Sequence, residues 1–204
     1  MASRLAVENM QALLQQYIKT ETPAPVDLFL ENALDMMDIS VTQAIGRQKG
    51  GTTVVAVYIV DGRLYWVSAG DSRLYAYRNG EMVQVTRDHN YFLRLNEELK
   101  SGEITQEYYR AEAEKGEHLI SFAGVGGISV FDLSREPVGL LEGDILLLTT
   151  DGLYKALPKE LIQHVLRSRN PLSVKADKLL SQIQVLKKNI VLDNTTFILI
   201  QIHE

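Results

Sequence analysis

The stretch that decides the fold is TTVVAVYIVDGRLYWVSAGDSRLYAYRNGEMVQVT, residues 52–86. It contains short runs rich in Val, Tyr and Trp, which suit a half-buried pleated surface. Asp-Gly and Asn-Gly pairs separate two of these runs from the next, and both pairs are typical of tight hairpin turns. The stretch therefore predicts a meander of antiparallel strands.

Two amphipathic helices are expected before this meander. Residues 3–19 carry apolar side chains at helical spacing, and the prolines of TETPAP end the pattern because proline does not fit a helix interior. Asp27 begins a second pattern of the same kind, which ends near GRQKGG, residues 46–51. The apolar face of each predicted helix needs a surface to pack against, and the predicted strands provide one.

The part of the chain after the meander divides into a charged segment, two predicted helices and a final strand. Residues 90–118 are polar and rich in charge, and predict one or two surface helices set apart from the sheet. Helices are also predicted at 152–169 and 173–188, before a final strand in TTFILIQI, residues 195–202. Helices segregated from an antiparallel sheet indicate an α+β fold with layered helices and sheets, in a single domain over residues 1–204.

Composition excludes several classes of function. The net charge of -5 argues against a nucleic-acid partner, and the absence of cysteine excludes thiolate chemistry and disulfides. No apolar stretch has the roughly 20 residues that a membrane helix needs, and the N-terminus does not resemble a signal peptide. We therefore expect a cytoplasmic protein with no membrane and no nucleic-acid partner.

Three acidic residues occur at the ends of predicted strands. Asp71 and Asp151 each directly follow one, and Asp193 shortly precedes the last one. Taken singly, each fits an ordinary turn, because Asp bonds to its own backbone. If the three meet at one rim of the sheet, their repulsion calls for a cation, and Mg²⁺ or Mn²⁺ suits such oxygen ligands.

Two further motifs favour structural roles. Gly124, Gly126 and Gly127 in GVGG predict a close bend between strands, because the Lys and helix of a phosphate-binding P-loop do not follow. Asp88 and His89 in TRDHNYF are expected to serve a solvent-side turn.

Taken in order, four segments resemble the PPM-type (type 2C) metal-dependent protein Ser/Thr phosphatases of bacterial type. They are GGTTVVAVYIVDGRLYWVSAGDSRLYAYRNGEMVQVTRDHNYF (50–92), SGEITQEYYRAEAEKGEHLISFAGVGG (101–127), GDILLLTTDGLYKAL (143–157) and LDNTTFILIQI (192–202). The resemblance implies an α-β-β-α sandwich of two antiparallel sheets flanked by helices, with residues 90–118 as a flap subdomain. It covers nearly the whole chain.

The resemblance also implies a chemistry. Asp151 and Asp193 would hold the main cluster of Mg²⁺ or Mn²⁺, with the Gly152 backbone beside it, and Asp71 would hold a third ion together with Asp151. A metal-activated water, rather than a catalytic side chain, would attack the phosphate monoester of a phosphorylated Ser or Thr in a protein substrate. The substrate-binding residues are not identified.

The front of the chain departs from the family pattern. ASRLAVENMQALL, residues 2–14, resembles the helix that follows the first metal-binding Asp-Gly turn of the family. The strands, the phosphate-binding Arg and the Asp-Gly turn that precede this helix in the family have no counterpart in residues 1–204. We therefore expect this chain to be N-terminally truncated, impaired in catalysis and prone to self-association through uncovered sheet edges. The alternative is a non-catalytic phosphatase-fold module that binds a regulatory partner.

Overall fold

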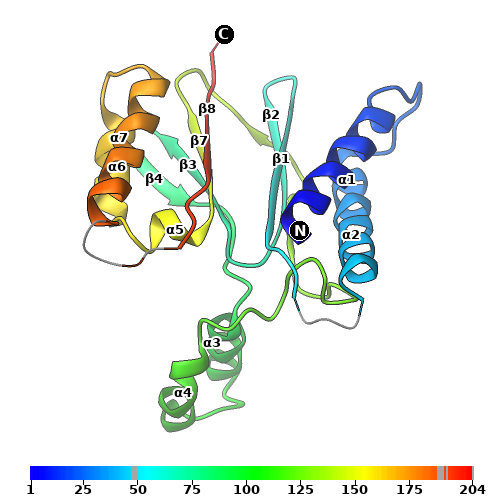
Figure 1. The fold of residues 1–204 in the computed structure, drawn as a ribbon, viewed down its shortest axis with the longest axis vertical. Coiled ribbons are helices and arrows are strands. Elements are labelled where there is room, and N and C mark those ends of the chain that lie inside the picture. Colours follow the sequence, from blue (N-terminus) through cyan, green and yellow to red (C-terminus); the bar gives the residue numbers. More distant parts are fainter. Residues whose placement is uncertain (47–49, 188–190, 192, 204) are drawn as a thin grey trace. The chain divides into compact units, whose positions relative to one another are not determined.

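The computed structural model describes residues 1–46, 50–187, 191 and 193–203, which form two compact units (Figure 1). The first unit comprises Met1–Val60, Leu64–Asp71 and Arg87–Pro137. The second comprises Asp61–Arg63, Ser72–Thr86 and Val138–Glu204. The predicted meander therefore contributes strands to both units.

The first unit is built on a helical hairpin and a small sheet. Helices α1 (Ala2–Tyr17) and α2 (Val26–Ile45) pack against each other. Strands β1 (Val54–Val60), β2 (Arg63–Ala69) and β5 (Asp132–Leu133) lie in the order β1-β2-β5. In the antiparallel pair β2–β5, Val67 lies opposite Leu133 and Ser68 opposite Asp132.

The core of the first unit forms where the stripe of α2 meets the sheet. The Tyr17 ring of α1 stacks on the Phe29 ring of α2 with centroids 4.1 Å apart, which joins the two helices at one end. Besides Ala6 of α1 and Ala123, the buried side chains belong to α2 and to the strands: Phe29, Leu30, Leu34, Met37, Val41, Val54, Val67 and Ala69. Their spacing of three or four residues along α2 is the predicted one.

The predicted flap is also part of the first unit. It contains α3 (Tyr91–Ser101), α4 (Gln106–Glu112) and the 3₁₀ turn η1 (Ala113–Lys115), which contact one another. The Asn90 and Thr105 side chains cap the two α-helices by accepting backbone N–H bonds. Both predicted surface helices are thus present.

The second unit has its own sheet and its own core. Strands β4 (Glu81–Gln84), β3 (Arg73–Arg78), β7 (Ile145–Thr149) and β8 (Phe197–Gln201) are antiparallel neighbours in the order β4-β3-β7-β8. A two-residue strand, β6 (Val138–Gly139), begins the last segment of this unit. Helices α5 (Asp151–Tyr154), α6 (Lys159–Arg167) and α7 (Leu172–Leu186) contribute Leu153, Ile162, Leu166, Leu179 and Ile183 to the core.

The prediction of an α+β fold with two antiparallel sheets and accompanying helices is confirmed. Most predicted and observed helix ends agree within a few residues, but the helix predicted over 152–169 is divided into α5 and α6 before Pro158, because proline does not fit a helix interior. Residues 47–49 and Lys188 lie outside the described part of the chain. No helix among the described residues is both long enough and apolar enough to cross a membrane.

Candidate metal centre

Asp151 lies where a fully buried strand ends. All five residues of β7, which lies between β3 and β8, are buried, so the first partly exposed side chains are those of Thr150 and Asp151. Asp151 then begins the short helix α5. Its side chain is 29% exposed, and Oδ2 lies 3.3 Å from the Nζ atom of Lys155, one helical turn further on. The carboxylate is thus close to solvent.

The segment that carries Asp193 packs directly on the Asp151–Gly152 turn. Thr150 donates its N–H to the Thr196 carbonyl at 3.0 Å, and the Thr195 hydroxyl donates to the Gly152 carbonyl at 3.0 Å. A Cβ atom on Gly152 would collide with the Asn194 carbonyl oxygen, so only glycine permits this close approach. The two aspartates therefore belong to turns at the same end of the pair β7–β8.

Within the described ranges, Asp193 receives one local hydrogen bond to its carboxylate. The residue is exposed, and its Oδ1 accepts the N–H of Asn194 at 2.6 Å, the next residue in the chain. A carboxylate in this arrangement keeps most of its lone pairs available for other ligands.

Asp71 belongs to the first unit, directly after β2. The preceding residue, Gly70, has a positive φ of 107°, and a Cβ atom there would collide with the Thr53 side chain. His89 makes two hydrogen bonds to Gly70. The Gly70 N–H donates to His89 Nδ1 at 3.1 Å, and the His89 N–H donates to the Gly70 carbonyl at 2.9 Å.

The donor chemistry of Asp151 and Asp193 fits a hard divalent cation, since both supply carboxylate oxygen. In the described ranges, no group of three His, Cys, Asp or Glu side chains is arranged to hold an ion. Of the predicted metal ligands, the second unit therefore supplies two, Asp151 and Asp193, which lie in turns at the same end of the pair β7–β8. The roles of Asp71, Asp151, Asp193 and Gly152 remain predictions.

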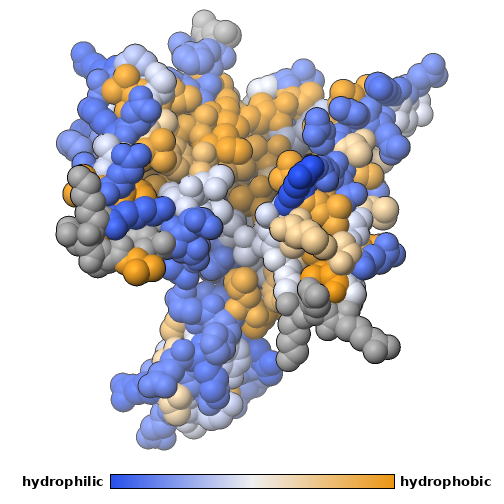
Figure 2. All heavy atoms as spheres, in the orientation of Figure 1, coloured by the Kyte–Doolittle hydropathy of each residue, from blue (hydrophilic) through white to orange (hydrophobic). Residues whose placement is uncertain are grey.

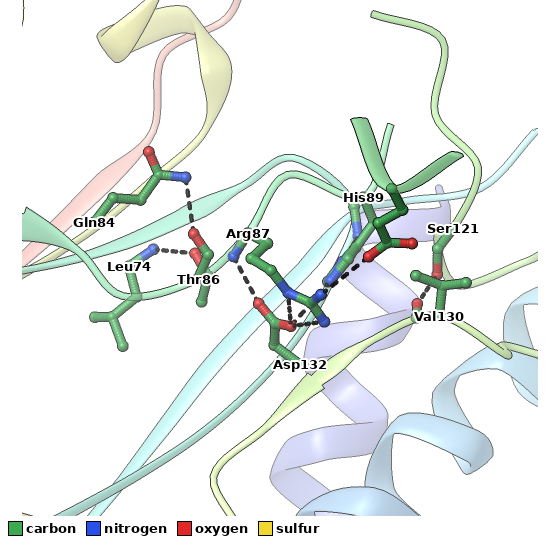
Figure 3. Close-up of polar contacts among 10 residues, drawn as sticks. Leu74, Gln84, Thr86, Arg87, His89, Ser121, Val130 and Asp132 are labelled. Atoms are coloured by element: carbon green, nitrogen blue, oxygen red, sulfur yellow. Dashed lines mark hydrogen bonds and ion pairs between the residues drawn. The ribbon is translucent and has the colours of Figure 1, made fainter. Parts of the chain in front are cut away.

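A different carboxylate, Asp132, is saturated with donors (Figure 3). Arg87 reaches it three times, through its backbone N–H at 2.6 Å, Nε at 2.8 Å and a terminal guanidinium nitrogen at 2.7 Å. His89 Nε2 lies 3.4 Å from Oδ1, a distance at which attraction is mainly electrostatic. Burial raises the pKa of Asp132, but the contacts from His89 and Arg87 outweigh it and lower the pKa to about 2.

The prediction of a solvent-side turn is wrong for His89. The side chain is fully buried, because both its backbone and its ring bond to Gly70 while its other ring nitrogen faces Asp132. Asp88 is half-buried. No signal within TRDHNYF distinguishes the two orientations, since they depend on contacts distant in sequence.

Sequence reasoning also missed Asp38 of α2. This buried carboxylate accepts the N–H groups of Gly124, Gly126 and Gly127 at 2.7, 3.2 and 2.6 Å. The three glycines have positive φ, and the chain bends at GVGG as predicted, around the Asp38 carboxylate. Of the two strands expected beside the bend, the described residues show the isolated bridge between Thr52 and Ala123 before it and the two-residue β5 after it. An acidic residue within the apolar stripe of α2 is the signal that could have found Asp38.

Comparison with solved structures identifies the class of proteins that share this fold. The chain superimposes on the serine/threonine phosphatase PstP/Ppp of Mycobacterium tuberculosis with a TM-score of 0.74 and 23% identity, covering 100% of this chain and 83% of that one. It also matches the catalytic domain of PstP in complex with two manganese ions, with a TM-score of 0.69 and 24% identity, over 96% and 80% of the two chains. The fold is that of the PPM phosphatases.

The sequence agrees with this class. Residues 1–97 match the family "Protein phosphatase 2C". The serine/threonine phosphatase stp of Listeria innocua is 31% identical over 173 residues, which are 85% of this chain and 62% of that protein. Together these matches support a bacterial phosphatase of the protein phosphatase 2C, or PPM, type. The chain spans less than two thirds of the length of the Listeria relative.

Proposed function

We propose that the chain belongs to a metal-dependent phosphatase that hydrolyses phosphate monoesters on Ser or Thr of protein substrates. The observation that carries the proposal is the contact between the Asp151–Gly152 turn and the Asp193–Asn194 turn, closed by the hydrogen bond from Thr195. This contact brings two turns that each carry an aspartate to the same end of the pair β7–β8. The similarity of the chain to serine/threonine phosphatases supports the same function.

Each acidic residue has an expected role toward Mg²⁺ or Mn²⁺. Asp151 and Asp193 would bind the main cluster, with the Gly152 backbone beside it, and Asp71 would bind a further ion. The PstP domain is described as a complex with two manganese ions, which supports this choice of metal. Bound ions of this kind supply an activated water and neutralise charge on the phosphoryl group.

Metal binding by calorimetry tests the site. Asp151→Ala should abolish specific Mn²⁺ binding, because it removes a ligand of the proposed main cluster. Asp177→Ala is the matched control, since Asp177 is an exposed acidic residue of α7 in the same unit. Unchanged Mn²⁺ affinity in Asp151→Ala would remove the assignment.

We further propose that residues 1–204 alone turn over phosphate esters slowly. The resemblance places the phosphate-binding Arg and the bridging Asp-Gly turn in a segment without a counterpart here, and the Listeria relative is matched over 62% of its length. Hydrolysis of p-nitrophenyl phosphate with Mn²⁺ at rates normal for the family would contradict this. Loss of turnover with retained partner binding would instead favour the non-catalytic alternative.

Self-association is proposed to occur through β8. Among the described residues, this edge strand pairs with β7 alone, and Ile198 on it is 55% exposed. Figure 2 shows apolar side chains gathered around β8. Uncharged edge strands of this kind pair readily with a second copy. Light scattering should show dimers that Ile198→Lys reduces, and a monodisperse monomer would refute the proposal.

A further inference from the structure

His89 is a buried polar residue to which neither the family resemblance nor the proposed function assigns a task. It is fully buried and meets three separate parts of the first unit: the Gly70 backbone, the Asp132 carboxylate and the Ile120 N–H, which donates to the His89 carbonyl at 3.0 Å. The Ile120 contact holds the backbone of His89, whereas Gly70 and Asp132 contact its ring, so both the backbone and the side chain have little freedom to move.

The hydrogen bonds of His89 fix the orientation of its ring. Nδ1 accepts the Gly70 N–H at 3.1 Å, so this nitrogen carries no proton. The proton is therefore on Nε2, which faces Asp132 Oδ1 at 3.4 Å. Asp132 is itself held by Arg87. The chain of contacts thus runs from Arg87 through Asp132 and His89 to the backbone of Gly70.

Gly70 is the residue directly before Asp71. Its positive φ is compatible with glycine alone, and its two backbone hydrogen bonds to His89 close a ring that fixes both of its peptide groups. The direction in which the next side chain leaves the backbone depends on these dihedral angles. The Asp71 carboxylate therefore takes its starting direction from His89.

We propose that His89 is a positioning residue for Asp71, acting through its Nδ1 hydrogen bond to Gly70. This inference rests on the proposed metal-binding role of Asp71. Groups that orient a metal ligand without touching the ion commonly change metal affinity by about 10- to 100-fold when they are altered.

Two substitutions separate the two ring nitrogens. His89→Asn places an oxygen near the Nδ1 position, so it keeps an acceptor for Gly70 and loses the contact with Asp132. His89→Gln places its amide near Nε2, so it keeps a donor for Asp132 and loses the acceptor for Gly70. The two variants have the same polarity and each retains one of the two contacts.

The experiment is Mn²⁺ calorimetry on wild type, Asp71→Ala and both His89 variants, with thermal melting of each. We expect Asp71→Ala to lose the weaker of the Mn²⁺ binding events. His89→Gln should weaken that event about tenfold, and His89→Asn should restore it to within about threefold of wild type. The difference should persist when the two His89 variants melt at similar temperatures, which a purely structural role would not produce.

The outcomes distinguish this inference from the proposed function. If Asp71→Ala binds Mn²⁺ as wild type does, both the metal role of Asp71 and the positioning role of His89 are refuted. If Asp71→Ala loses the event but His89→Gln keeps it, only the positioning role is refuted. Equal losses in both His89 variants, in proportion to lost thermal stability, would likewise refute it.

Discussion

Asp132 in the first unit lies in β5 and Asp193 in the second lies shortly before β8, yet the surroundings of these two carboxylates are opposite. The Asp132 side chain is 12% exposed and receives three contacts from Arg87 and one from His89. Asp193 is exposed and accepts the N–H of its own neighbour. A carboxylate whose lone pairs are filled by protein donors stabilises the fold, whereas one left open can bind a ligand.

Removing the saturated carboxylate should have the largest effect on stability. Asp132→Ala leaves the buried His89 ring and the Arg87 guanidinium without their shared acceptor, and hydrogen bonds to charged groups contribute about 1.5–3 kcal/mol each. Because Arg87 is half exposed and can turn to water, we expect a loss of roughly 3 kcal/mol in the free energy of unfolding. Urea denaturation measures it. A loss below about 1 kcal/mol would contradict the assignment of Asp132 as a carboxylate that stabilises the fold.

The Asp132 carboxylate should also make the free energy of unfolding depend on pH in the acidic range. Its pKa falls from the ordinary value of 3.8 to about 2 on folding, so the unfolded chain binds the proton more readily. The stabilisation is fully present above pH 3.8 and is lost as the pH falls toward 2. At about 1.4 kcal/mol per pKa unit it amounts to roughly 2.5 kcal/mol. Denaturation at several pH values should show this slope, reduced in Asp132→Asn.

A substitution in the second unit tests the contact between its two acidic turns. Gly152→Ala forces a Cβ atom against the Asn194 carbonyl oxygen and the Thr195 hydroxyl. Overpacking of this kind costs about 1–3 kcal/mol, and the Asp193 segment must move to relieve it. We expect weaker Mn²⁺ binding together with a moderate loss of stability. Gly139→Ala is a suitable control, because no atom lies near the position of its Cβ.

The sequence predicts the parts of the fold that depend on local pattern. The Asp-Gly pair at 61–62 marks the turn between β1 and β2, and the Asn-Gly pair at 79–80 marks the turn between β3 and β4. The apolar spacing along α2 predicts its buried face. The sequence does not predict that the meander supplies strands to two sheets. Strand partners such as Leu147 and Leu199 are far apart in the chain, and nothing within either strand specifies the other.

The candidate site shows the same limit. Asp151 can be singled out because a buried apolar run ends just before it, and Asp193 because a strand starts a few residues after it. The sequence does not single out Asp132, because its strand β5 has two residues and is too short to show a hydrophobic pattern. The burial of His89 depends on Gly70, 19 residues earlier, and on Asp132, 43 residues later, so no local signal could reveal it.

Asp193→Ala should have the smallest effect on stability. The residue is exposed and its hydrogen bond to Asn194 is local, so the free energy of unfolding should change by less than about 0.5 kcal/mol. Mn²⁺ binding should nevertheless weaken, since the open carboxylate is a proposed ligand. Calorimetry and urea denaturation on the same variant separate the two quantities. A large stability loss with unchanged Mn²⁺ affinity would place Asp193 beside Asp132 as a structural carboxylate and remove the contrast between them.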